Sequence, residues 1–286
     1  MPDTVLELLD RSDPSAAAIG APGRSDLTYA ELAALIGETA GALNGFGIGR
    51  NDAVAIVLPN GPEMATAFLG VAAGATAAIV DIGPFSLLET MRLADGRLCR
   101  LDLHLDRAAA AAHFFGIDWN SASVAAACDA AAKEHTVGSW RARLLIDRDG
   151  RATVDCTPYT PNRGPRRVAF SVAPIDDQDP FLYNKTTRRS QYEMARRARP
   201  DVEDVLLWNA RGEVTESTIA NVIVEIDGIL WTPPVASGLL AGVFRRELLR
   251  SGSIRERVLT RKAVAQAPRL WLVNSLREWM DVVLVT

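Results

Sequence analysis

The sequence has few cysteines, and their spacing matches neither a disulfide framework nor a metal knuckle. Cys99, Cys128 and Cys156 are widely separated in a chain of 286 residues. An odd number of scattered cysteines favours a reducing compartment, so we expect a cytoplasmic protein without a metal site. The first residues also lack the basic segment and apolar core of a secretory signal.

Long apolar runs and a strong excess of one charge are absent as well. The most apolar run, 65–80, is shorter than the roughly 20 residues of a membrane span and is rich in alanine and glycine. A formal net charge of −4 gives no reason to expect nucleic-acid or membrane binding. With 48% hydrophobic and 23% charged residues, the composition is that of a globular protein.

Lysine is scarce. Lysine and arginine together number 31, but only Lys133, Lys185 and Lys262 are lysines. Because arginine stays protonated in proteins, chemistry that needs a neutral amine has only these three candidates.

Turn and cap signals indicate how the chain is organised. Residues 28–31 have the spacing of a capping box, and a helix, a strand at 52–58, a turn at 59–62 and a helix at 63–78 follow. Beyond residue 83, Asp-Gly turns predict hairpins, and helices are expected at about 103–115, 121–134, 187–199 and 242–250. A strand is also expected at 255–260. This mixture predicts an α/β (α+β) fold rather than a purely parallel sheet.

Two short segments contain titratable residues that could carry out catalysis. Lys185 follows aromatic residues and precedes two arginines, and a cationic or buried setting would lower its pKa and make it a nucleophile. A solvated lysine at a helix start is the commoner explanation. Glu213 and Glu216 lie among threonine, serine and asparagine. A buried glutamate there could face a protonated ring nitrogen, whereas a polar edge loop explains the pattern equally well.

Three further segments could bind an anion. Gly238 and Gly242 precede a helix whose first amides are free to hold a phosphate, although many helices begin after glycine. Arg107, three residues after His104, could clamp a phosphate or be solvated. Residues 274–275 end an apolar strand, where ligand groups often lie but where chains also simply leave a sheet.

In this order along the chain, these segments resemble the class IV aminotransferase family, the pyridoxal-phosphate enzymes of fold type IV. The resemblance covers about residues 83–286 and includes 85–92, His104 with Arg107, Lys185, 215–221, 238–245 and 274–275. It implies the two-domain fold of the D-amino acid aminotransferase type, here with domains at 83–160 and 161–286. A proline-containing stretch, 158–166, is the expected linker. Segments 87–92, 179–189 and 212–221 are most similar to 4-amino-4-deoxychorismate lyases.

The resemblance implies a role for each matched residue. Lys185 would hold pyridoxal 5′-phosphate as a Schiff base and shuttle a proton, and Glu216 would pair with the ring nitrogen. The residues that would hold the phosphate are Arg107, Ser275 and the amides of Gly242 and Val243. Ile219 and Asn221 would line the cofactor. Arg92, Arg188 and Arg189 are candidates for the substrate carboxylate, although a surface role fits each of them equally.

Three functions stay open at this point. The first is a lyase that releases 4-aminobenzoate and pyruvate from 4-amino-4-deoxychorismate. The second is an aminotransferase for a branched-chain or D-amino acid, and the third is an inactive fusion that acts as a binding module. The resemblance also implies a homodimer that acts on a small molecule.

Residues 1–82 form a separate segment, and most of it resembles a different family, the AMP-binding acyl-CoA synthetases. The match is carried by 27–32 and 52–64 and covers only that family's N-terminal strand–helix layer. A phosphate loop ending in Pro-Lys is absent from the chain, so adenylation is not expected. This segment stands where stand-alone class IV enzymes have a strand before 87–92. We therefore expect an open edge on the small-domain sheet.

Overall fold

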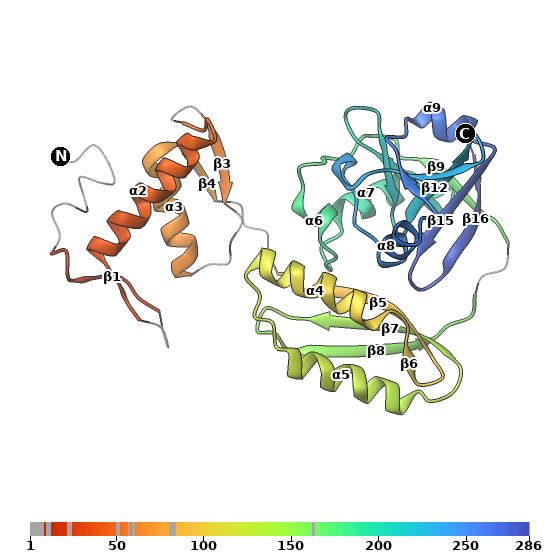
Figure 1. Cartoon of the computed structure of the whole chain (residues 1–286), viewed down its shortest axis with the longest axis horizontal. Coiled ribbons are helices and arrows are strands. Elements are labelled where there is room, and N and C mark those ends of the chain that lie inside the picture. The colour runs from red at the N-terminus through yellow and green to blue at the C-terminus, as the bar shows by residue number, and fades with distance from the viewer. Residues whose placement is uncertain are drawn as a thin grey trace. The chain divides into compact units, whose positions relative to one another are not determined.

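The computed structural model describes residues 9, 13–21, 25–49, 52–56, 58, 61–79, 84–161 and 164–285. The chain forms two compact units, Met1–Pro84 and Phe85–Thr286 (Figure 1). Parts of the predicted turn at 59–62 and of the predicted linker at 158–166 lie outside the described residues. The division of the second unit at residue 160 stays a prediction.

The first unit contains two small strand pairs and two helices. Its elements are β1 (Ala17–Ile19), β2 (Leu27–Thr28), α2 (Tyr29–Gly45), β3 (Ala53–Ile56), α3 (Pro62–Gly74) and β4 (Thr76–Ile79). The predicted capping box is confirmed, because the Thr28 hydroxyl accepts from the Glu31 amide and the Glu31 carboxylate accepts from the Thr28 amide. The predicted helix 63–78 is wrong beyond residue 74, since β4 pairs in parallel with β3.

The second unit begins with a four-stranded antiparallel sheet and two helices (Figure 1). The elements are β5 (Leu87–Ala94), β6 (Arg97–Leu98), α4 (Leu101–Phe115), α5 (Ser121–Glu134), β7 (Ser139–Ile146) and β8 (Ala152–Pro158). Asp95 and Gly96 both have positive φ, as a two-residue Asp-Gly hairpin requires. Leu87, Met91 and Leu93 are buried on one face, and α4 packs against β5.

The outer edge of β5 is partly covered. The sheet order is β6-β5-β7-β8, and β6 pairs with β5 only at residues 93–94. Further along, the Leu88 amide donates to the Lys185 carbonyl at 3.0 Å, and the Thr187 amide donates to the Ser86 carbonyl at 2.9 Å. The predicted open edge is therefore only partly open, because the segment that contains Lys185 lies along it.

The rest of the second unit is a curled, eight-stranded mixed sheet. Its order is β11-β10-β9-β16-β15-β12-β13-β14, and β11 also pairs with β12, so six strands form a closed ring. The strands are β9 (Arg166–Phe170), β10 (Asp204–Trp208), β11 (Val214–Ser217), β12 (Asn221–Ile226), β13 (Ile229–Thr232), β14 (Arg255–Glu256), β15 (Arg269–Asn274) and β16 (Glu278–Leu284). Parallel and antiparallel pairs both occur, which confirms the mixed α/β prediction.

Short helices join these strands. They are α6 (Pro180–Tyr183), α7 (Ser190–Ala198), η1 (Val235–Ser237), α8 (Val243–Arg250) and α9 (Arg261–Gln266). Helix α7 begins three residues later than the predicted helix 187–199. Strand β14 covers only the first two residues of the predicted strand 255–260. Val222, Val224 and Leu272 are fully buried in the main core of the sheet. No helix in the described ranges has the length and apolar character that a membrane span needs.

Candidate active site

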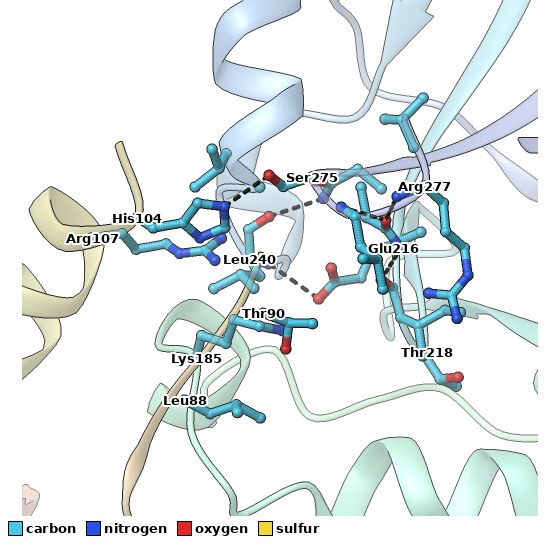
Figure 2. Close-up of a pocket in the computed structure, with 18 of the residues that line it drawn as sticks. Leu88, Thr90, His104, Arg107, Lys185, Glu216, Thr218, Leu240, Ser275 and Arg277 are labelled. Atoms are coloured by element: carbon cyan, nitrogen blue, oxygen red, sulfur yellow. Dashed lines mark hydrogen bonds between the residues drawn. The ribbon is translucent and has the colours of Figure 1, made fainter. Parts of the chain in front are cut away.

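A cavity of about 330 Å³ lies in the second unit, between the small sheet and the curled sheet. Its walls come from β5, β7, α4, the segment that begins at Lys185, the β11–β12 turn, the loop before α8, and the end of β15. The lining residues on which the description below depends are Thr90, His104, Arg107, Arg141, Arg143, Lys185, Arg189, Tyr192, Glu216, Ile219, Asn221, Leu240, Gly242, Val243, Ser275 and Arg277. Figure 2 shows most of these side chains pointing into one space.

Lys185 lines this cavity instead of projecting from a helix start. It follows α6, whose first amides are capped by Asp179, and its carbonyl is tied to β5 by the Leu88 amide. Burial, together with the charges of Arg107 and Arg189, lowers the pKa of Lys185 to about 8. A substantial fraction of this amine is therefore neutral near physiological pH. The explanation as an ordinary solvated lysine is wrong.

Among the described residues that line the cavity, Glu216 is the only carboxylate. It lies on β11 and is buried, with 4% of its surface exposed. Its Oε1 accepts from the Tyr192 hydroxyl at 2.7 Å. It also accepts from the Leu240 amide at 3.1 Å (Figure 2). Burial outweighs these bonds and raises the pKa of Glu216 to about 7. Both bonds end on Oε1, so Oε2 is left to interact with a bound ligand. It can donate its own proton to the ligand or accept one from it. The polar-edge-loop explanation is wrong.

A chain of buried polar groups connects α4 to the end of β15. Glu89 accepts from both Arg107 Nε at 2.8 Å and Arg107 Nη2 at 2.5 Å. Burial raises the pKa of Glu89, but the Arg107 charge and hydrogen bonds from His104 and Arg107 outweigh it and bring that pKa to about 2. His104 Nδ1 therefore donates to the ionised Glu89, at 2.6 Å. Nε2 lies 2.7 Å from the Ser275 hydroxyl.

The loop before α8 has no room for a side chain at Gly242. A Cβ atom there would lie 1.9 Å from Asn221 Oδ1. The side-chain Nδ2 of Asn221 in turn donates to the Leu240 carbonyl at 2.9 Å. Gly242 is the N-cap of α8, and no side chain caps this helix. The amides of Gly242 and Val243 thus stand free at a helix N-terminus, an arrangement that suits a phosphate.

Most of the predicted site residues come together here, but two do not. Arg92 pairs with Glu278 at 3.2 Å, and Arg188 lies over the Phe181 ring at 4.7 Å; neither lines the cavity. The substrate role of these two stays a prediction, and the alternative role outside the site agrees with these contacts. Arg189 does line the cavity, where it contacts the Thr218 carbonyl and lies over the Tyr192 ring.

Several lining residues were missed by the sequence analysis. They are Thr90, Arg141, Arg143, Tyr192, Leu240 and Arg277. A signal existed for the two on β7: residues 141 and 143 share one face of a strand whose alternate residues, 142 and 144, are fully buried. Tyr192 and Arg277 became visible only when distant segments met.

The sequence and the fold both match known proteins. The family model of class IV amino-transferases matches residues 86–285. The chain belongs to the class IV aminotransferase family. The family model of AMP-binding enzymes matches residues 10–149 and so overlaps with it. In the structure, residues 86–149 belong to the same compact unit as the remainder of the class IV match.

Individual relatives agree with this placement. A Schizosaccharomyces pombe protein, provisionally named an aminodeoxychorismate lyase, is 32% identical over 209 residues, which is 70% of this chain and 90% of that protein. A Mesorhizobium loti structure, provisionally described as an amino-acid aminotransferase, is 35% identical with a TM-score of 0.67. The match covers 70% of this chain and all of that one. A hypothetical aminotransferase from Mycobacterium tuberculosis, solved with pyridoxal phosphate bound, shares the fold at 23% identity and a TM-score of 0.61, over 70% and 81% of the two chains.

Enzymes of this family use pyridoxal phosphate, and the cavity fits that cofactor. It offers one amine of lowered pKa, one buried carboxylate with a free oxygen, and free amides beside a glycine that cannot carry a side chain. Within the described residues, no group of three histidine, cysteine or acidic side chains is placed to hold a metal ion.

Proposed function

We propose that this class IV enzyme is a lyase that converts 4-amino-4-deoxychorismate to 4-aminobenzoate and pyruvate. The observation that carries the proposal is the placement of Lys185 and Glu216 on one cavity. One supplies an amine with a pKa of about 8, and the other a carboxyl with a pKa of about 7. Each of these two groups can gain or lose a proton near neutral pH.

Six groups of the chain would hold the cofactor. Lys185 would bind it covalently through Nζ, and Glu216 Oε2 would hold the proton at its ring nitrogen. Arg107, the Gly242 and Val243 amides and Ser275 would hold its phosphate. When bound, pyridoxal phosphate supplies an electron-accepting ring that stabilises negative charge at the substrate carbon next to the amine.

Lys185 would then act as a base and as an acid. Its neutral Nζ, released when substrate binds, can remove the proton from the carbon that bears the amino group. The lowered pKa of Lys185 favours this step, because more of the amine is unprotonated at neutral pH. The resulting ammonium can return the proton to the departing enolpyruvyl group, so the reaction needs no second substrate.

An aminotransferase is the second candidate, since the same residues could instead return the proton to the cofactor. The Mesorhizobium loti relative supports this alternative and the Schizosaccharomyces pombe relative supports the lyase. The segment similarity at 87–92, 179–189 and 212–221 favours the lyase.

Pyruvate release separates the two candidates. The purified protein is loaded with pyridoxal phosphate and given 4-amino-4-deoxychorismate without any 2-oxo acid. Pyruvate and 4-aminobenzoate in equal amounts support the lyase. Turnover that starts only after a 2-oxo acid is added contradicts it and supports the aminotransferase. A folded protein that captures no cofactor would support the inactive binding module.

Family resemblance and cysteine usage support three further parts of the proposal. We infer that the enzyme acts in the cytoplasm, as a homodimer, and supplies 4-aminobenzoate for folate synthesis. Sedimentation equilibrium of the holoenzyme tests the dimer, and a monomer at micromolar concentration would contradict it.

A further inference from the structure

Among the described residues, three half-buried arginines line the cavity without a hydrogen-bond or ion-pair partner: Arg141, Arg143 and Arg277. Arg141 lies on β7, and Arg277 lies in the turn between β15 and β16. Within the described part of the chain, neither guanidinium makes a hydrogen bond or an ion pair. Other arginines of this unit do have carboxylate partners: Arg100 pairs with Glu278 at 2.9 Å, and Arg107 with Glu89. Arg141 and Arg277 are half-buried and lack such a partner among the described residues.

Both guanidiniums line the same cavity, although they come from two different sheets. Burial, followed by the charges of Arg166 and Arg141, lowers the pKa of Arg277. Both groups nevertheless stay protonated, because the guanidinium pKa lies far above neutrality. Asp204 acts in the opposite direction on Arg277, but no ion pair joins these two residues in the described structure. Two like charges that line one partly buried cavity cost free energy unless an anion binds there.

The surroundings add to the positive charge. Arg143 lies on the same face of β7 as Arg141, opposite Thr90 in the strand register. Asp155 opposes Arg143 across β7 and β8, but it is exposed and makes no ion pair with it in the described structure. Counting the whole lining, five arginines and Lys185 stand against one carboxylate, Glu216.

The bound cofactor would neutralise only part of this charge. Its phosphate would lie at Arg107 and the α8 amides, and its ring nitrogen at Glu216. Figure 2 shows Arg277 across the cavity from Arg107 and His104, with Glu216 between them. Arg277 is therefore placed on the side of the cavity away from the residues that would hold the phosphate.

We propose that Arg141 and Arg277 together bind a carboxylate of the substrate and so select a dicarboxylate over amino acids with apolar side chains. The inference rests on the proposed function, which defines the amine end of the substrate that reacts. A dicarboxylate has one carboxylate that can bind Arg141 and Arg277. Its second carboxylate can bind the other arginines of the cavity wall. An amino acid with an apolar side chain would leave unpaired arginines beside its side chain, which is unfavourable.

Binding of an unreactive probe tests the pair without turnover. Isophthalate has two carboxylates on one ring and benzoate has one, and the affinity of each for the holoenzyme is measured by calorimetry. We expect isophthalate to bind the wild type at least about tenfold tighter. Arg141→Met and Arg277→Met should each weaken isophthalate binding roughly ten- to a hundredfold, the usual cost of a lost charged hydrogen bond, with a smaller effect on benzoate.

Controls separate recognition from a structural role. Arg151→Met removes the same charge from an exposed position at the start of β8 and should bind isophthalate as the wild type does. Arg277→Lys should recover part of the lost affinity. Unchanged isophthalate affinity in both methionine variants would overturn the inference. So would equal losses for isophthalate and benzoate, or a loss of cofactor trapped on Lys185 by borohydride.

The same variants distinguish this inference from the proposed lyase. If the wild type prefers isophthalate but releases no pyruvate, the lyase proposal fails. The assignment of Arg141 and Arg277 as the carboxylate-binding pair then still holds. If the wild type releases pyruvate, Arg141→Met and Arg277→Met should raise KM for 4-amino-4-deoxychorismate about tenfold or more, with little change in kcat. An unchanged KM in both variants would refute the pair alone.

Discussion

Among single residues, the three lysines allow a clear comparison. Lys185 lines the cavity, whereas Lys133 and Lys262 are exposed on helices. We expect Lys185→Ala to abolish borohydride-trapped cofactor and to reduce turnover by about a thousandfold or more, because both the covalent link and the base are lost. Lys133→Ala and Lys262→Ala should behave as the wild type does. Turnover near the wild-type level in Lys185→Ala would contradict the assignment.

Glu216 makes a prediction about stability and pH. In the cofactor-free protein its pKa is about 7, against 4.5 when exposed, so the folded state holds a proton that the unfolded state releases. The free energy of unfolding should therefore fall as pH rises from about 4.5 to 7, by up to about 3 kcal/mol from this group. Glu216→Gln should lack that part of the fall in urea unfolding measured across this range.

Glu213 is a matched control with the opposite sign. The hydrogen bond from Arg211 lowers its pKa, so the stability that Glu213 contributes is present at neutral pH and lost in acid. Glu213→Gln should differ most from the wild type at neutral pH. Identical pH dependence in Glu216→Gln and the wild type would mean that Glu216 is not held protonated by burial.

At the level of elements, helix α8 offers a comparison between its two ends. A side chain at Gly242 would overlap with Asn221 Oδ1, so Gly242→Ala should displace the loop that holds the free amides. We expect a loss of about 1–3 kcal/mol in stability and a marked weakening of pyridoxal-phosphate affinity, measured by titration.

Gly252, just beyond the other end of α8, provides the control. It has a φ of +71° and no atom within 4 Å of an added Cβ. Gly252→Ala should cost about 1 kcal/mol for the left-handed backbone and leave cofactor affinity unchanged. Equal cofactor affinity in the two alanine variants would refute the role assigned to the loop before α8.

Elements differed in how well the sequence predicted them. α4 and α5 were predicted within two residues, because alanine-rich helical periodicity and the Asn120 cap are local features. β4 was mistaken for a continuation of α3. Its strand state depends on pairing with β3, and short apolar segments fit a helix or a strand equally well until a partner is present.

At the scale of the whole molecule, the described cavity residues all belong to the second unit. All the residues that line it fall between Leu88 and Arg277, beyond the boundary at Pro84. We therefore expect a chain truncated to residues 85–286 to fold and to capture pyridoxal phosphate on Lys185. Circular dichroism and borohydride trapping would check this. A folded truncated chain that captures no cofactor would show that the first unit contributes to the site.

The candidate catalytic and cofactor-binding residues could be found from the sequence because each lies in a short motif that is recognisable without the fold. Lys185, Glu216, Arg107 and Ser275 were identified from local motifs and from the order of those motifs along the chain, and the structure brings all four to one cavity. Each motif has a local cause, such as a glycine before a helix or a polar residue at the end of an apolar strand.

Only the tertiary structure decided what these side chains can do. The pKa of Lys185 is lowered by burial and by arginines from α4 and from the start of α7, segments far apart in sequence. Arg141 and Arg277, which have no partner among the described residues, line one cavity only because two separate sheets face it. Arg92 and Arg188 are turned toward other partners. Burial and charge proximity depend on long-range packing, and a linear pattern does not contain them.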